Sequence, residues 1–193
     1  MSDEKLRLFT AVRVPETHLA WLDDATAAAK ALPGARWTAP ENQHVTLNFI
    51  GWTPSGNLPL VVGALDAVGT RHGPSDASIS GLGTFPSERR ARVLWAGIDD
   101  PDGLLPALAG DLGDELRAAG YVPEDRAYTA HLTLARFKTP RSVAGLLPEL
   151  PAPPGTFTID RITLFRSRLS PSGARYEVLH EAYLGADDAR VSH

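Results

Sequence analysis

His44-Val45-Thr46-Leu47 returns later in the chain as His131-Leu132-Thr133-Leu134, so the pattern His, aliphatic, Thr, Leu occurs twice. Each copy sits in an apolar run that predicts a buried strand. Side chains two positions apart in a strand point to the same face, which places each His beside its Thr and turns the aliphatic residues to the opposite face. We therefore expect two matching faces, each carrying one imidazole and one hydroxyl group.

The segments around the two copies repeat in the same order. Before each copy lie an apolar strand and a helical stretch, and after each copy lie a shorter helix and another strand. The first set covers residues 6–14, 17–32, 58–71 and 75–85, and the second covers residues 92–98, 103–119, 141–150 and 156–167. A last strand at residues 175–184 forms a hairpin with the one before it. Two copies of so long a unit indicate a duplicated lobe, because a solenoid needs at least three repeats.

This duplication predicts one bilobal domain of the α+β class over residues 1–185, followed by a flexible tail at residues 186–193. Two lobes related by a pseudo-two-fold axis would bring the two His/Thr faces together across a cleft. Since one chain would supply both halves of such a site, we expect a monomer.

The composition is that of a soluble globular protein, with 43% hydrophobic and 22% charged residues. The chain has no cysteine, which excludes disulfides, thiolate nucleophiles and cysteine-based zinc sites and favours a cytoplasmic location. No apolar run approaches the roughly 18 residues that a membrane span requires.

The formal net charge of -4 argues against a protein that coats duplex DNA or long RNA through phosphate contacts. Basic residues nevertheless outnumber acidic ones between Arg136 and Tyr176. Most of these side chains fit a solvated face. A local basic wall in an acidic protein also fits an anionic ligand of modest size.

Two histidines on opposite sides of a phosphodiester can catalyse its hydrolysis, because an imidazole serves as base or acid near neutral pH. One activates a water molecule and the other protonates the departing sugar oxygen. Each Thr hydroxyl can donate a hydrogen bond to a non-bridging phosphate oxygen. Such a site needs no metal, cofactor or covalent intermediate.

Other interpretations of the motif remain open. A single buried His is more often structural than catalytic, and duplication alone can preserve a pair without chemistry. Metal binding by the two His is weakly supported, since no carboxylate lies at ligand spacing and Thr is a poor zinc ligand. Two copies at equivalent positions of a repeat favour catalysis.

Together with flanking segments, the paired motifs resemble those of the 2H phosphoesterase superfamily. Within it the chain is most similar to the RNA 2',3'-cyclic phosphodiesterases of bacteria and archaea, also described as 2'-5' RNA ligases. The similar segments include Arg7-Leu8-Phe9-Thr10-Ala11-Val12, Asn48-Phe49-Ile50-Gly51, Thr129-Ala130 before the second motif and Phe165-Arg166-Ser167-Arg168-Leu169.

The resemblance implies two antiparallel sheets that face a central cleft, with helices on the outside. It implies metal-independent opening of a 2',3'-cyclic phosphate to a 2'-phosphate. His44 and His131 would be the general acid and base, in an order that stays open, and Thr46 and Thr133 would bind the phosphate. Arg136 matches a family arginine that would contact phosphate or nucleotide.

Strict strand alternation places Arg136 on the face opposite His131, so it reaches the site only if the strand bends or ends there. The first copy has Phe49 at the corresponding position, and the two lobes therefore differ in function.

Weaker candidates are two groups of residues that suit RNA but have simpler explanations. Aromatic side chains could stack a base, although aromatics at strand ends more often belong to the core; they are Phe9, Trp37, Trp52 and Phe85. Arg89, Arg90 and Arg92 could follow an RNA tail or simply form a solvated loop.

The expected function is hydrolysis of cyclic phosphate ends of RNA or nucleotides. The alternatives are a phosphodiesterase for another small cyclic phosphate, 2'-5' RNA ligation, and a non-catalytic RNA-end binding protein.

Overall fold

The computed structural model describes residues 4–122, 127–170 and 173–185, and the tail expected at residues 186–193 lies outside them. The helices and strands are β1 (Lys5–Val12), α1 (Glu16–Ala25), β2 (Ala35–Trp37), β3 (Val45–Pro54), α2 (Leu58–Arg71), β4 (Ser75–Phe85), β5 (Ala91–Asp99), α3 (Leu104–Ala118), β6 (His131–Arg141), β7 (Phe157–Ile159), β8 (Arg161–Ser170) and β9 (Gly173–Tyr183). This is the α+β fold that the sequence predicts.

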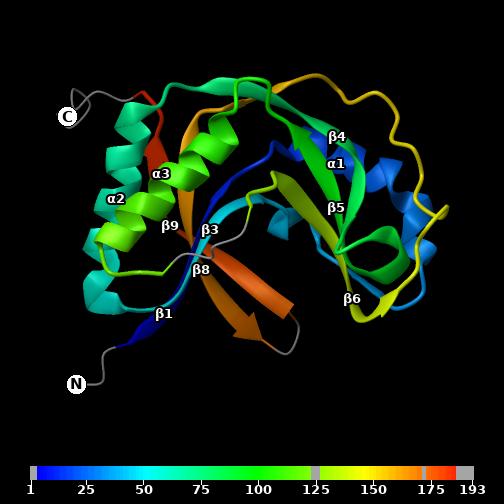
Figure 1. Ribbon diagram of the computed structural model, residues 1–193, viewed down its shortest axis with the longest axis horizontal. Coiled ribbons are helices and arrows are strands. Elements are labelled where there is room, and N and C mark those ends of the chain that lie inside the picture. Colours follow the sequence, from blue (N-terminus) through cyan, green and yellow to red (C-terminus); the bar gives the residue numbers. More distant parts are fainter. Residues whose placement is uncertain (1–3, 123–126, 171–172, 186–193) are drawn as a thin grey trace.

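The strands form two antiparallel groups, ordered β7-β4-β5-β6 and β3-β1-β8-β9, with the short β2 added to β6. The two groups meet where Val45 of β3 pairs with Leu132 of β6. Figure 1 shows the groups on either side of this junction. Val45 and Leu132 are the second residues of the two repeated motifs, so the motifs lie on adjacent strands at the centre of the molecule.

Each group of strands includes strands from the other half of the chain. β4 follows the first motif but pairs with β5, whereas β8 follows the second motif but pairs with β1. The stretch expected as one strand over residues 156–167 is divided at Asp160, because β7 pairs with β4 in one group and β8 pairs with β1 in the other. The two halves of the chain are therefore interlocked.

Helices cover the two groups unequally. α2 and α3 pack against β3, β8 and β9, on the left of Figure 1. α1 packs against the other group, where His18 contacts the Phe157 ring edge to face at 5.2 Å. No helix in the described part of the chain is long and apolar enough to cross a membrane.

The prediction of a helix over residues 141–150 is wrong, because that segment forms turns and irregular structure. Gly145 has a φ of 71°, a left-handed conformation that ends a helical path, and Pro148 follows it. The second lobe therefore lacks a counterpart of α2.

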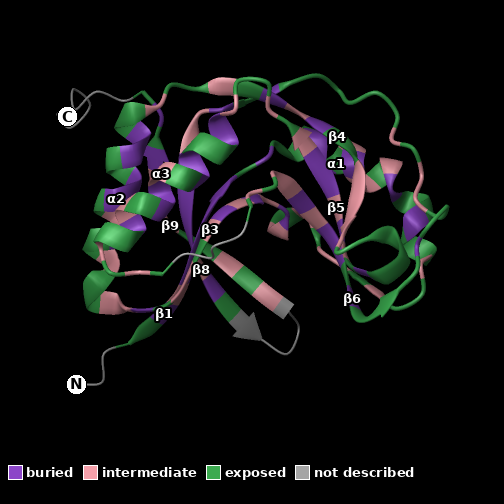
Figure 2. Cartoon of the chain, in the orientation of Figure 1, coloured by how far each residue is buried: buried purple, intermediate pink, exposed green. Residues whose placement is uncertain are grey.

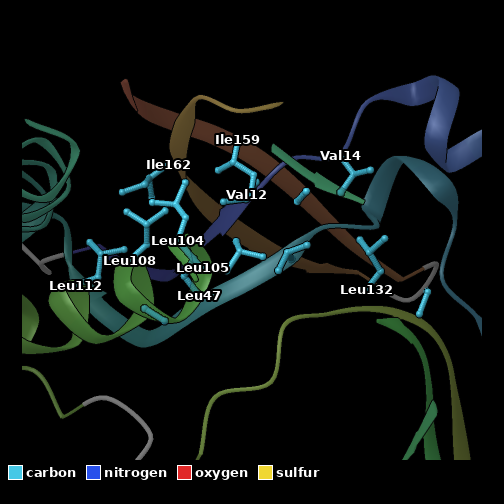
Figure 3. Packing of buried hydrophobic residues seen from close by; sticks show 14 of the residues in the cluster. Val12, Val14, Leu47, Leu104, Leu105, Leu108, Leu112, Leu132, Ile159 and Ile162 are labelled. Carbon is cyan, nitrogen blue, oxygen red and sulfur yellow. The ribbon is translucent and has the colours of Figure 1, made fainter. Parts of the chain in front are cut away.

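One hydrophobic cluster joins both lobes. Leucines of α3 line one side of it and contact the region of Leu47, as Figure 3 shows; they are Leu104, Leu105, Leu108 and Leu112. Figure 2 shows the buried stripe that these residues form on α3. Leu47 and Leu132 face this core, so the His/Thr faces point to the other side of the sheet.

Candidate functional site

The two motifs share one face of the sheet. Val45 and Leu132 are fully buried in the core, and in an antiparallel pair the residues on either side of them face the opposite way. This register places the His of each motif next to the Thr of the other. The structure thus brings together the four residues singled out in the sequence: His44, Thr46, His131 and Thr133.

A cavity of about 540 Å³ opens on this face. Its lining includes His44, Thr46, Thr133 and Arg136 but not His131, which packs beside it. Burial is the main cause that lowers the pKa of the His44 imidazole, and the positive charges of a protonated His131 and of Arg136 lower it further. A protonated His131 therefore disfavours protonation of His44.

His44 is enclosed by aromatic rings. Its ring stacks on Phe9 at 4.8 Å and on Phe165 at 5.8 Å, and it meets Tyr176 edge to face at 5.2 Å. This burial lowers the pKa of His44 to about 4, although a hydrogen bond to the Asn42 backbone acts in the opposite direction. His44 is consequently neutral at pH 7.

His131 has a different aromatic environment and a similar backbone hydrogen bond. Its Nδ1 lies 2.7 Å from the carbonyl oxygen of Thr129. An Nδ1–H that donates to this oxygen makes Nε2 the ring nitrogen without a proton in the neutral imidazole. The ring meets Phe85 edge to face at 5.1 Å and lies 6.1 Å from Trp95. The Trp95 indole lies over Gly83, where an added Cβ would come within 2.2 Å of the ring.

A β-bulge brings Arg136 to the cavity. Trp95 of β5 pairs with Thr133, but Leu94 pairs with Ala135, so Leu134 is the extra residue. Leu134 and Ala135 are both buried, and the alternation is reset after them. Arg136 therefore lies on the same face as Thr133, and the bend that its role requires is present.

The first motif carries the same bulge. Ala11 of β1 pairs with Thr46 and Thr10 pairs with Asn48, which leaves Leu47 as the extra residue. The Asn48 side chain points away from the cavity and donates a hydrogen bond to the Ala109 carbonyl of α3 at 3.1 Å. Phe49 then returns to the cavity face. Phe49 and Arg136 thus occupy equivalent positions in the two lobes.

Several other residues line the cavity without a role assigned from the sequence, and the polar or aromatic ones on β1, β8 and β9 are Arg7, Ser167 and Tyr176. Arg7 Nη1 lies 3.4 Å from Ser167 Oγ, across the β1–β8 pair. Ser167 belongs to a segment that resembles the family, but only the strand order shows that β8 and β9 lie beside the first motif.

The aromatic and arginine candidates from the sequence lie in different environments. Phe9 and Phe85 pack against the two histidines, Trp37 packs against the main core, and Trp52 is exposed. Three further arginines are exposed and do not line the cavity: Arg89, Arg90 and Arg92.

Three of the seven basic residues between Arg136 and Tyr176 are paired with carboxylates. Three arginines form ion pairs on the surface, Arg161 with Asp160 and Glu181, Arg166 with Glu4, and Arg168 with Glu177. Within the described ranges no carboxylate forms an ion pair with Arg136, so its charge remains available to an anion. Nor do the described residues contain a group of three His, Asp or Glu side chains that could hold a metal ion.

Comparisons with known proteins identify relatives of this chain. The 2'-5' RNA ligase superfamily profile matches residues 14–170. A Methanothermobacter thermautotrophicus protein named RNA 2',3'-cyclic phosphodiesterase is 34% identical over 179 residues, which cover 89% of this chain and 95% of the relative. A Thermus thermophilus protein of the same name is 31% identical over 193 residues, which cover 96% and 93% of the two chains.

Solved structures share the fold. A Thermus thermophilus crystal structure superposes with a TM-score of 0.82 at 29% identity, covering 94% of this chain and 100% of that one. Escherichia coli LigT in complex with 3'-AMP has a TM-score of 0.78 at 24% identity and covers 95% of this chain and 100% of that one, which concerns the fold alone. The profile and the relatives span most of the chain, and the chain therefore belongs to the 2'-5' RNA ligase superfamily of 2H phosphoesterases.

Proposed function

We propose that this protein hydrolyses the 2',3'-cyclic phosphate ends of RNA or nucleotides to 2'-phosphates, without a metal ion. The observation that carries this proposal is the Val45–Leu132 pair, which sets both motifs on one face of the sheet. The relatives named RNA 2',3'-cyclic phosphodiesterase support the choice of substrate.

The reaction is one in-line displacement at phosphorus. The water oxygen forms a bond to phosphorus as the bond from phosphorus to the sugar 3' oxygen breaks. Thr46 and Thr133 donate hydrogen bonds to the non-bridging oxygens, where charge increases in the transition state. Arg136 offers two parallel N–H donors and a fixed positive charge to the same phosphate.

We assign the general base to His44 and the general acid to His131. A base must be neutral before the reaction, and burial keeps His44 neutral at pH 7 by lowering its pKa to about 4. His44 takes a proton from the water, and His131 gives a proton to the 3' oxygen. Each ring is held by a backbone hydrogen bond two residues earlier in the chain.

Both lobes of one chain supply this site, so the proposal needs only a monomer. An RNA substrate also fits a cytoplasmic protein. The region from residue 1 to residue 185 acts as one functional domain in this account.

The test uses purified protein, excess EDTA and an oligoribonucleotide that ends in a 2',3'-cyclic phosphate. Phosphorus NMR of the product distinguishes a 2'-phosphate from a 3'-phosphate. We expect a 2'-phosphate. A 3'-phosphate, or turnover only after metal is added back, would contradict the proposal. Binding without turnover would identify a protein that only binds RNA ends.

A further inference from the structure

The face of β3 that carries the first motif continues outward from the catalytic pair. Two bulges interrupt this strand, one at Leu47 and one where Leu8 pairs with Gly51 and Phe9 pairs with Phe49. Each bulge inserts one extra residue into β3 and shifts the alternation of its two faces by one position. The face of β3 that continues from His44 therefore carries Thr46, Phe49 and Trp52; Phe49 lines the cavity, and Trp52 lies beyond its lining.

The register with β1 gives the spacing along this row. Thr46, Phe49 and Trp52 pair with residues of β1 that are two positions apart, which are Ala11, Phe9 and Arg7. Two residues of a strand span about 7 Å. Phe49 thus lies about 7 Å beyond the phosphate-binding Thr, and Trp52 lies about 7 Å beyond Phe49. Neighbouring nucleotides of an unstacked single strand are spaced in the same way.

Both aromatic side chains are unusually open to solvent. Phe49 is 45% exposed and Trp52 is 63% exposed. Phe49 lines the cavity, and its only ring contact within the described residues is a tilted one to Phe9 at 6.1 Å. No aromatic ring of the described chain packs against Trp52. Core packing therefore does not explain either residue, whereas stacking on a base requires an exposed ring face.

Arg7 places a positive charge beside Trp52. It pairs with Trp52 in register and lines the cavity. The equivalent row of β6 departs from this pattern, because Arg136 stands where β3 has Phe49. The β3 side of the site thus combines aromatic rings with Arg7, and the β6 side adds Arg136, so the site offers rings for the bases of single-stranded RNA and cations for its phosphates.

We propose that Phe49 and Trp52 form a two-step stacking platform for the last two bases of a single-stranded RNA, with Arg7 on the phosphate between them. The inference rests on the proposed function, because it places the cyclic phosphate at the two histidines. The base of the terminal nucleotide stacks on Phe49. The base of the preceding nucleotide stacks on Trp52, so the site prefers an oligonucleotide over a mononucleotide.

The test compares 2'-AMP with the dinucleotide ApA that carries a 2'-phosphate, both as bound ligands, and the corresponding 2',3'-cyclic phosphates as substrates. We expect the wild-type protein to bind the dinucleotide more tightly. Trp52→Ala should reduce this preference about tenfold, whereas Trp52→Phe should retain most of it. Phe49→Ala should weaken binding of both ligands about tenfold. Leu60→Ala, at an exposed leucine of α2, is the control and should change neither.

The binding measurement separates this inference from the proposed function. A preference for the dinucleotide that depends on Trp52, with no turnover of either cyclic phosphate, would overturn the proposed function alone. Turnover with a preference unchanged by Trp52→Ala would overturn the platform alone. Arg7→Gln should lower the salt dependence of dinucleotide binding, and an unchanged dependence would remove Arg7 from the platform.

Discussion

The two copies of the motif share a backbone but differ in what surrounds it. Both strands bulge immediately after the Thr, both histidines have a backbone hydrogen bond two residues earlier, and both stand beside aromatic rings. After the bulge the first lobe presents Phe49 and the second presents Arg136. The two lobes thus place one imidazole and one hydroxyl group alike, and they differ at the position after the bulge, which is aromatic in the first lobe and cationic in the second.

The largest expected effect comes from removing either histidine. His44→Ala and His131→Ala should each reduce kcat by about 10²–10⁴-fold, because each removes one proton-transfer partner. Steady-state kinetics on a cyclic phosphate substrate measures this, with circular dichroism as the check on folding. If one variant kept wild-type turnover, the two copies would not be partners.

Replacing either threonine should have the next largest effect. Thr46→Val and Thr133→Val keep the shape of the side chain and remove the hydroxyl, so each should lower kcat by about 10²-fold. Thr→Ser restores the donor and should recover most of the loss. Equal defects in the Val and Ser variants would mean that the methyl group, rather than the hydroxyl, is needed.

Replacing Arg136, the cationic residue of the second lobe, should affect substrate binding more than the chemical step. Arg136→Gln should raise KM about tenfold, since the phosphate loses a charge-assisted pair of hydrogen bonds. Arg136→Lys keeps the positive charge without the planar guanidinium group, so its KM should lie between those of the wild type and Arg136→Gln. Arg92→Gln, an exposed arginine outside the cavity, serves as the matched control. An unchanged KM in Arg136→Gln would show that the bulge does not deliver this side chain to substrate.

The smallest expected effect is a change in the pKa of His44 when the charge of Arg136 is removed. NMR titration of the free protein should give a pKa of about 4 for His44. Arg136→Gln should raise it, because a nearby positive charge disfavours the protonated imidazole. With His44 as base, kcat/KM should decline at the acid end only as the pH approaches 4. A loss of kcat/KM on deprotonation of His44 would instead make it the acid.

Several parts of this arrangement could be predicted from the sequence. The period-2 alternation in each motif correctly placed Val45 and Leu132 in the core and the His/Thr pairs on the other face. The duplicated order of segments correctly indicated an α+β fold with two related halves. These features depend on local patterns that a short window of sequence contains.

Other parts depend on long-range pairing, which no short window of sequence contains. The bulges that return Phe49 and Arg136 to the cavity are visible only in the register with β1 and β5. Strict alternation therefore placed Arg136 on the wrong face. The division of residues 156–167 into β7 and β8 likewise depends on which strands receive them. Arg7 and Tyr176 were missed because their strands approach the first motif only after folding.

The central claim is that the two motif copies act as one acid–base unit, and a double-mutant cycle tests it most directly. The kcat values of His44→Ala, His131→Ala and the double variant are measured on one cyclic phosphate substrate. Residues that act together in a single displacement show strongly non-additive effects. We predict that the double variant is no slower than the slower single variant, within a few-fold. Losses that multiply would contradict the account, because each histidine would then contribute independently of the other.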